Sequence, residues 1–127
     1  MSNITLSDGE WKIMKLLWKS APRTIGEIVS ELKEDTGWTK TTVFVMLKRL
    51  IAKGAVRVDD SGKIQKYYPL IVKDDVAPAE TDSFLSRVYD GSVGMMISAL
   101  AGRHALSEDD LAALRKILSD AEKREEE

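Results

Sequence analysis

The amino-acid sequence predicts a mainly α-helical protein with one small β-hairpin, organised as an N-terminal domain and a helical C-terminal domain. Three observations carry this prediction. Apolar residues recur at helical spacing in three capped segments before residue 54, the period then changes from 3.6 to 2, and helical spacing returns after residue 80. The 127 residues are enough for one ordinary domain, or for a domain of about 70 residues with an appendage.

The first helix is expected to begin at a capping box, Ser7-Asp8-Gly9-Glu10, in which the hydroxyl and the carboxylate each satisfy a backbone N–H of the other residue. It runs to about Lys19 with apolar side chains on most sides, which is typical of a central, largely buried helix. Ala21-Pro22 is expected to end it.

Two further helices follow in the N-terminal half. A second capping box, Thr24-Ile25-Gly26-Glu27, opens a helix that should stop near Thr36-Gly37. Thr39 is the expected N-cap of the third helix, and Gly54 its C-terminal glycine. The third helix has one apolar stripe, formed by Val43, Met46, Leu47, Leu50 and Ile51.

A β-hairpin is expected after the third helix. Residues 55–59 and 63–68 are predicted to be two strands joined across Asp60-Ser61-Gly62, with Pro69 ending the second strand. Three helices followed by a hairpin is the element order of a winged helix-turn-helix domain, which we place at residues 1–72.

The aromatic residues of this half favour the core over a base-stacking role. Trp11, Trp18 and Trp38 each belong to or adjoin an apolar stripe, and Tyr67-Tyr68 is expected to pack the hairpin onto the helices.

The last third of the chain predicts a helical dimerisation domain at residues 81–127, after a hinge at 73–80 where Pro78 and two adjacent acids discourage regular structure. Glycines at 91 and 102 and a cap at Ser107 divide it into helices. So short a segment rarely buries enough surface alone, and a second copy is the economical partner. The residues expected at the homodimer interface are Phe84, Leu85, Val88, Met96, Ile97, Leu100, Leu111, Leu114 and Leu118.

Composition excludes several classes of function. Cysteine is absent and His104 is the single histidine, so no metal site or cofactor is expected, and no spacing suggests a nucleophile paired with a base. We therefore expect no enzyme. No segment has the roughly 20 apolar residues of a membrane span, and the start Met1-Ser2-Asn3-Ile4-Thr5 lacks a signal-peptide pattern, so a cytoplasmic protein is expected.

Charge is divided along the chain. Residues 1–72 have a net charge of +4 and residues 73–127 a net charge of −6, so a polyanionic partner should meet the front half. On the third helix, short hydroxyls and Val45 suit base edges and thymine methyls, while cations suit phosphates. The residues predicted to contact double-stranded DNA are Thr39, Lys40, Thr41, Thr42, Val45, Lys48 and Arg49 on the helix, and Arg57, Lys63 and Lys66 on the hairpin.

Two alternatives stay open from the residues alone. Thr39 and Thr42 could simply cap the helix while the cations form a solvated surface, although exposed Phe44 and Val45 have no purpose on such a surface. A winged helix can also dock an acidic protein instead of DNA.

The sequence resembles the penicillinase repressor family of BlaI, MecI and CopY over nearly its whole length. The segments that carry the resemblance are Leu6–Trp18, Gly37–Val43, Leu47–Leu50, Lys53-Gly54, Tyr67-Tyr68, Phe84–Tyr89 and Leu106–Leu111. Phe44 and Val45 stand where more polar residues are expected in the family, which implies a different operator sequence. The copper-responsive branch binds metal through C-terminal cysteines that this chain lacks.

The resemblance implies a homodimeric repressor that binds a two-fold symmetric operator, one winged helix to each half-site, and controls a β-lactamase or related resistance operon. An unrelated operon is the alternative. In the β-lactam branch a membrane-bound sensor protease, directly or through a downstream protease, is thought to trigger cleavage of the repressor's tail. At the position of that branch's Asn-Phe cleavage pair this chain departs from the pattern and has Ala99-Leu100, which the resemblance implies as the corresponding proteolytic site.

Overall fold

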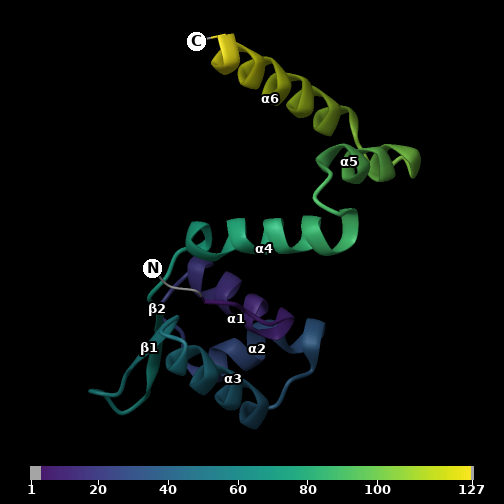
Figure 1. The fold of residues 1–127 in the computed structure, drawn as a ribbon. Coiled ribbons are helices and arrows are strands. Elements are labelled where there is room, and N and C mark those ends of the chain that lie inside the picture. The colour runs from purple at the N-terminus through teal and green to yellow at the C-terminus, as the bar shows by residue number, and fades with distance from the viewer. Residues whose placement is uncertain (1–3, 127) are drawn as a thin grey trace. The chain divides into compact units, whose positions relative to one another are not determined.

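The structure is a computed structural model that describes residues 4–126, so Glu127 and the first three residues of the N-terminal stretch lie outside it. Within this range the order of elements is α1, α2, α3, β1, β2, α4, α5, α6 (Figure 1). The chain divides into two compact units, one up to Glu80 and one from Thr81 onward. A mostly helical chain with one antiparallel hairpin confirms the predicted fold class.

Capping boxes begin the first two helices as predicted. At α1 (Asp8–Lys19), the Ser7 hydroxyl accepts from the Glu10 N–H at 3.2 Å and the Glu10 carboxylate accepts from the Ser7 N–H at 2.8 Å. At α2 (Ile25–Thr36), Thr24 and Glu27 make the same pair of bonds at 3.1 and 3.0 Å.

The third helix also has the predicted limits. α3 (Lys40–Ala52) begins after Thr39, whose hydroxyl accepts from the Thr42 N–H at 3.2 Å. The glycines that end α2 and follow α3 have positive φ angles, +67° at Gly37 and +81° at Gly54, which a side chain would strain.

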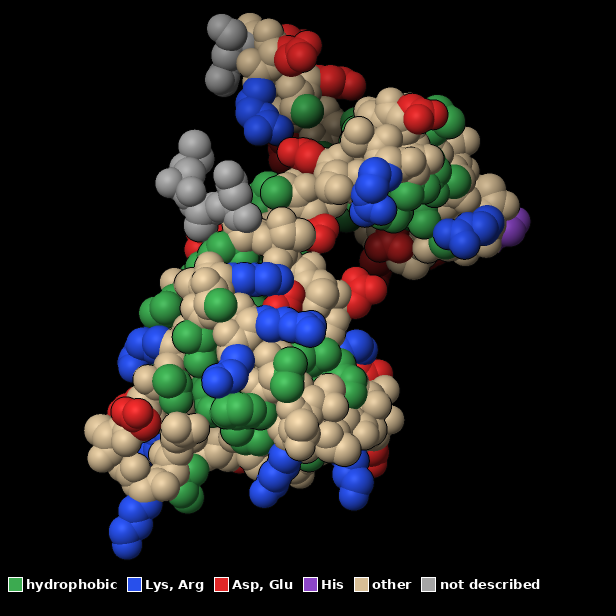
Figure 2. All heavy atoms as spheres, turned by 60° about the horizontal axis from the view of Figure 1, so that its bottom comes forward, with side chains coloured by type: hydrophobic (Ala, Val, Ile, Leu, Met, Phe, Trp, Pro, Cys, Tyr) green, Lys and Arg blue, Asp and Glu red, His purple; other side chains and the backbone are tan. Residues whose placement is uncertain are grey.

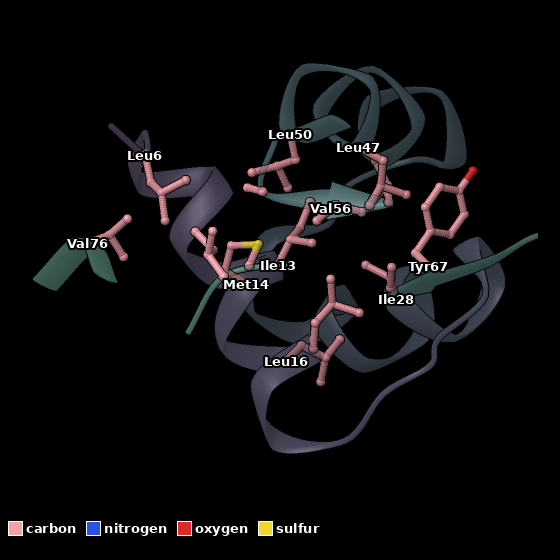
Figure 3. Packing of buried hydrophobic residues seen from close by; sticks show 14 residues of the cluster. Leu6, Ile13, Met14, Leu16, Ile28, Leu47, Leu50, Val56, Tyr67 and Val76 are labelled. Atoms are coloured by element: carbon pink, nitrogen blue, oxygen red, sulfur yellow. The ribbon is translucent and has the colours of Figure 1, made fainter. Parts of the chain in front are cut away.

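The core of the N-terminal unit lies where α1 meets α2, α3 and the hairpin (Figure 3). Ile13 and Met14 of α1, Leu47 of α3 and Tyr67 of β2 are almost completely buried in it. The three tryptophans pack against this cluster, and Trp18 Nε1 donates to the Ile71 carbonyl at 2.7 Å, so their predicted core role is confirmed.

The hairpin pairs β1 (Val56–Asp59) with β2 (Lys66–Pro69), and Pro69 ends the second strand as predicted. The prediction that this strand starts at Lys63 is wrong. Asp59 lies opposite Lys66, and its carboxylate accepts from the backbone N–H and the hydroxyl of Ser61, which turns the chain away from the sheet directly after β1. Residues 60–65 therefore form the connecting loop, the tip of the wing.

A short third piece of sheet joins the hairpin to the helices. Arg23, directly before the cap of α2, exchanges two backbone hydrogen bonds with Tyr67 at 2.9 and 3.2 Å on the free edge of β2. A bridge made by a single residue has no alternating apolar and polar pattern, so the sequence does not reveal this pairing. This bridge fixes the wing to the start of α2.

The expectation that residues 73–80 lack regular structure is wrong, because α4 (Lys73–Tyr89) runs through them. The Asp75 carboxylate accepts from the Val72 N–H at 2.9 Å at the start of the helix, where acids also favour the helix dipole. Pro78 removes one hydrogen bond of this helix. Burial of Val76 in the core of the N-terminal unit offsets that loss.

The C-terminal unit continues with α5 (Val93–Gly102) and α6 (Glu108–Glu126). Ser107 caps α6 as predicted, exchanging two hydrogen bonds of 3.0 Å with Asp110. No side chain between residues 81 and 126 is buried. In the described part of the chain, the helices are too short or too polar to cross a bilayer.

Candidate nucleic-acid interface

The outward face of α3 carries the predicted DNA-contacting side chains. The inner stripe of Val43, Leu47 and Leu50 is completely buried, and this fixes which face of the helix points to solvent. Lys40, Thr41, Val45, Lys48 and Arg49 are all exposed on that outward face. A helix anchored by one face and cationic on the other can enter a DNA groove.

Thr39 and Thr42 have a local structural role. Thr39 caps α3, and its hydroxyl lies 3.2 Å from that of Thr42, which is half-buried. The simple capping interpretation of these two hydroxyls therefore accounts for their positions. Thr41, one residue along, lies on the exposed surface and is the better placed hydroxyl for a base edge.

Cations of α3 and of the wing lie over aromatic rings. The Lys48 ammonium is 5.3 Å from the centre of the Phe44 ring, and the Arg57 guanidinium is 4.0 Å from the centre of the Tyr68 ring. Arg57 and Tyr68 are directly opposite each other in the hairpin register. Stacking restricts these long side chains, so they lose less freedom when they bind a phosphate.

Lys63 and Lys66 belong to different parts of the wing. Lys63 lies in the exposed loop at the tip, and Lys66 is the exposed first residue of β2. Two carboxylates near these cations accept hydrogen bonds from neighbouring residues. Hydrogen bonds from Ser61 lower the pKa of Asp59, and those from Thr24 lower the pKa of Glu27, with smaller contributions from nearby Arg and Lys charges.

A groove of about 590 Å³ lies between the starts of α2 and α3 and the end of the wing loop. Its lining includes three apolar residues that the predicted site did not contain, one from each of these segments. The residues that line it are Thr24, Ile25, Gly26, Lys40, Thr41, Phe44, Ile64 and Gln65. Ile25 and Ile64 could not be assigned to it from sequence, because the Arg23–Tyr67 bridge that brings their segments together has no sequence pattern.

The far end of α3 is held by an ion pair that the sequence also does not reveal. Lys53, after the last turn of α3, donates to the Glu10 carboxylate of α1 at 2.5 Å and to the Thr5 carbonyl at 2.8 Å. Burial raises the pKa of Glu10, but hydrogen bonds from Lys53 and Ser7 outweigh it, so the pKa lies below its usual value. Lys53 therefore holds α3 in position against α1 and is not part of the outward face.

Comparisons with known proteins agree with this geometry. The family model described as penicillinase repressor matches residues 6–120. The chain belongs to the penicillinase repressor family. A penicillinase repressor of Bacillus licheniformis is 32% identical over 96% of this chain and 95% of its own length. The methicillin resistance regulatory protein MecI of Mammaliicoccus sciuri is 26% identical over 90% and 93%, respectively.

Solved structures of a repressor in the family match the N-terminal unit. The solution structure of the DNA-binding domain of BlaI is 36% identical, with a TM-score of 0.52 over 59% of this chain and 93% of that one. The solution structure of monomeric Bacillus licheniformis BlaI in complex with the blaP half-operator is 35% identical. Its TM-score is 0.50, and the match covers 57% of this chain and 88% of that one. Penicillinase repressors are DNA-binding transcription regulators, so this chain is a transcriptional repressor and not an enzyme.

The residues predicted for dimerisation lie on α4, α5 and α6, and all are exposed or half-buried. Phe84, Val88 and Leu118 are 44%, 50% and 60% exposed. An apolar groove of about 440 Å³ lies between α5 and α6, with Leu100 and Leu114 among its lining residues. Ala99 and Leu100 are half-buried in the C-terminal half of α5.

Proposed function

We propose that this member of the penicillinase repressor family acts as a homodimer on a two-fold symmetric operator, with one winged helix at each half-site. The observation that carries the proposal is the outward face of α3, where Lys40, Lys48 and Arg49 are exposed, as are the cations of the wing. The BlaI complex with the blaP half-operator shows a related domain bound to DNA and supports the same partner here. The proposed operator binding implies a cytoplasmic location.

The C-terminal unit supports dimerisation. Its helices expose large apolar side chains along their length, among them Val93, Met95 and Ile117, and bury none. Exposed apolar area on this scale marks a surface for another protein chain. A second copy supplies the same helices with two-fold symmetry, which matches a symmetric operator.

We further propose that the operon encodes a β-lactamase or a related resistance function, because the relatives are named for penicillinase and methicillin resistance. Release would follow the sensor-protease route, with the cut at Ala99-Leu100. This bond lies within α5, so the helix must open locally before a protease can bind it. In producing cells a β-lactam should shorten the chain by the residues after 99, which mass spectrometry would detect. A chain that stays intact while transcription rises contradicts this route.

Salt dependence tests DNA binding directly. A dimer that contacts on the order of 6 to 10 phosphates should lose about 10³-fold or more in affinity between 50 and 200 mM salt, because each contact releases condensed counterions. Fluorescence anisotropy with a random-sequence duplex, measured on the full chain, gives the slope. A flat slope contradicts direct DNA binding.

Sedimentation of the full chain tests the dimer. The wild type should be a dimer at micromolar concentration, and Leu118→Asp should shift it to monomer, because a charge would be buried in an apolar interface. Leu70→Asp is the matched control, since Leu70 is 54% exposed but lies in the N-terminal unit. A monomeric wild type, or equal dissociation of both variants, contradicts dimerisation through the tail.

A further inference from the structure

The cationic face of α3 has exposed apolar side chains at its centre. Phe44 is 39% exposed and Val45 is 43% exposed, on a face that otherwise bears cations and a hydroxyl. Ile64, at the end of the wing loop, is 63% exposed and lines the same groove as Phe44. In the N-terminal unit, Figure 2 shows hydrophobic side chains among separate Lys and Arg side chains.

Helical spacing arranges these side chains in two parallel rows. Residues four apart lie one above the other on a helix, so Phe44 lies between Lys40 and Lys48 in one row. The 5.3 Å distance from the Lys48 ammonium to the Phe44 ring confirms contact within this row. Val45 lies between Thr41 and Arg49 in the second row. Each row therefore has an apolar centre and a cation at one end or both.

This arrangement specifies the chemistry of its partner. The cations require phosphates on both sides, and the apolar centres require methyl or methylene groups between those phosphates. In the major groove of DNA, the phosphates line the two edges and the thymine C5 methyl is the one apolar group on the base edges. An acidic protein could satisfy the cations, but it offers no regular spacing of anions on both sides of an apolar strip.

We propose that Phe44 and Val45 read thymine methyl groups, so that the preferred operator carries thymine at the positions these side chains contact. The inference rests on the proposed DNA binding and adds a specificity to it. Contacts of Arg and Lys with phosphates supply affinity that is independent of base sequence. Contact with the C5 methyl distinguishes thymine from cytosine, which has no methyl at that position.

Replacement of thymine by deoxyuridine tests the inference, because it removes the methyl and leaves base pairing and phosphates unchanged. Selection from a random duplex library with the full chain gives the preferred duplex, in which each thymine is then replaced in turn. Loss of one buried methyl should weaken binding about fourfold, and replacement of the symmetric pair in both half-sites about 16-fold. Thymines outside the contacted positions should show no change.

Two variants connect the effect to these residues. Val45→Ala and Phe44→Ala should each weaken binding to the thymine duplex. Each variant should also lose the deoxyuridine penalty at the one thymine that its side chain contacts, so that the thymine and deoxyuridine duplexes bind equally well there, as in a double-mutant cycle. Ile51→Ala is the matched control, since Ile51 lies outside both rows and is 37% exposed, contrary to its predicted place in the inner stripe. It should keep the full penalty.

The outcomes separate this inference from the proposed function. A selected duplex whose affinity is unchanged by every deoxyuridine, or a penalty that persists in both variants, overturns methyl reading while DNA binding stands. A selection that enriches only G·C pairs does the same. Absence of any binding to duplex DNA at low salt overturns the proposed function, and the inference fails with it.

Discussion

Removing Glu10 and removing Lys53 should lower the free energy of unfolding by different amounts, because the two side chains of this ion pair differ in burial. The Glu10 side chain is 2% exposed and one of its oxygens, Oε2, has no hydrogen-bond partner, whereas the Lys53 side chain is 36% exposed. Lys53→Met leaves a buried carboxylate without its cation. Glu10→Gln keeps the capping box, since glutamine also serves at this position, and leaves an ammonium that can turn to water.

The magnitudes follow from this difference. Breaking a fully buried pair costs about 3–5 kcal/mol, and an exposed pair contributes about 0–1 kcal/mol. Glu10→Gln should therefore lower the free energy of unfolding by about 1–2 kcal/mol, and Lys53→Met by about 2–3 kcal/mol. Lys12→Met is the matched control, because Lys12 pairs with Asp35 at the surface, where both side chains are well exposed. It should change stability by less than about 0.5 kcal/mol.

The pH dependence of stability gives a second measurement. The pKa of Glu10 is lower in the folded protein than in the unfolded chain, so its contribution is complete above the unfolded value and is lost as pH falls toward the folded one. Urea unfolding of the full chain at fixed protein concentration should show the wild type and Glu10→Gln converging as pH falls below about 4.5. A gap that is constant with pH, or a larger loss for Glu10→Gln than for Lys53→Met, would refute the reasoning.

Two further predictions concern the start of α1 and the wing. Gly9 and Gly26 are both the second residue of a capped helix, but an added Cβ would lie 2.7 Å from Met46 Cε at Gly9 and no closer than 3.9 Å to any neighbour at Gly26. Gly26→Ala should raise the free energy of unfolding by about 0.5–1 kcal/mol in urea titrations, and Gly9→Ala should show none of this gain. Equal gains would contradict the packing at Gly9. Arg57→Ala should weaken binding to all duplexes alike and reduce the salt slope by about 0.9, and a loss confined to one sequence would contradict a phosphate contact.

The sequence predicts the helix caps and the apolar stripe of α3 well, because both depend on local chemistry. Both capping boxes, the Thr39 cap and the stripe that orients α3 depend on residues three or four apart, so their pattern is visible without a structure. The exposure of Val45 follows from the same stripe. The outward cations of α3 were predictable because burying three apolar residues of one face leaves the opposite face to solvent.

Predictions were wrong or incomplete where a tertiary contact overrides local preference, or where two local preferences compete. Pro78 breaks a helix in isolation, but Val76, two residues earlier, is 3% exposed in the core, and its burial stabilises α4 through the proline. The wing loop is longer than predicted because Asp59 bonds to Ser61 in competition with the strand. The groove beside α3 depends on a single backbone bridge between residues 44 positions apart, which no local pattern encodes.

Three contacts together fix the orientation of the outward face of α3 and of the wing beside it. Lys53 fixes the C-terminal end of α3 to α1, Thr39 fixes the conformation of its first turn, and the Arg23–Tyr67 bridge fixes the wing against α2. None of these groups belongs to the outward rows of α3, so the rows can change without loss of the scaffold. Phe44 and Val45 therefore stand at positions where the fold permits almost any exposed residue. Their apolar character is better explained by what they bind than by what holds the domain together, which is why a test on the DNA bases addresses it directly.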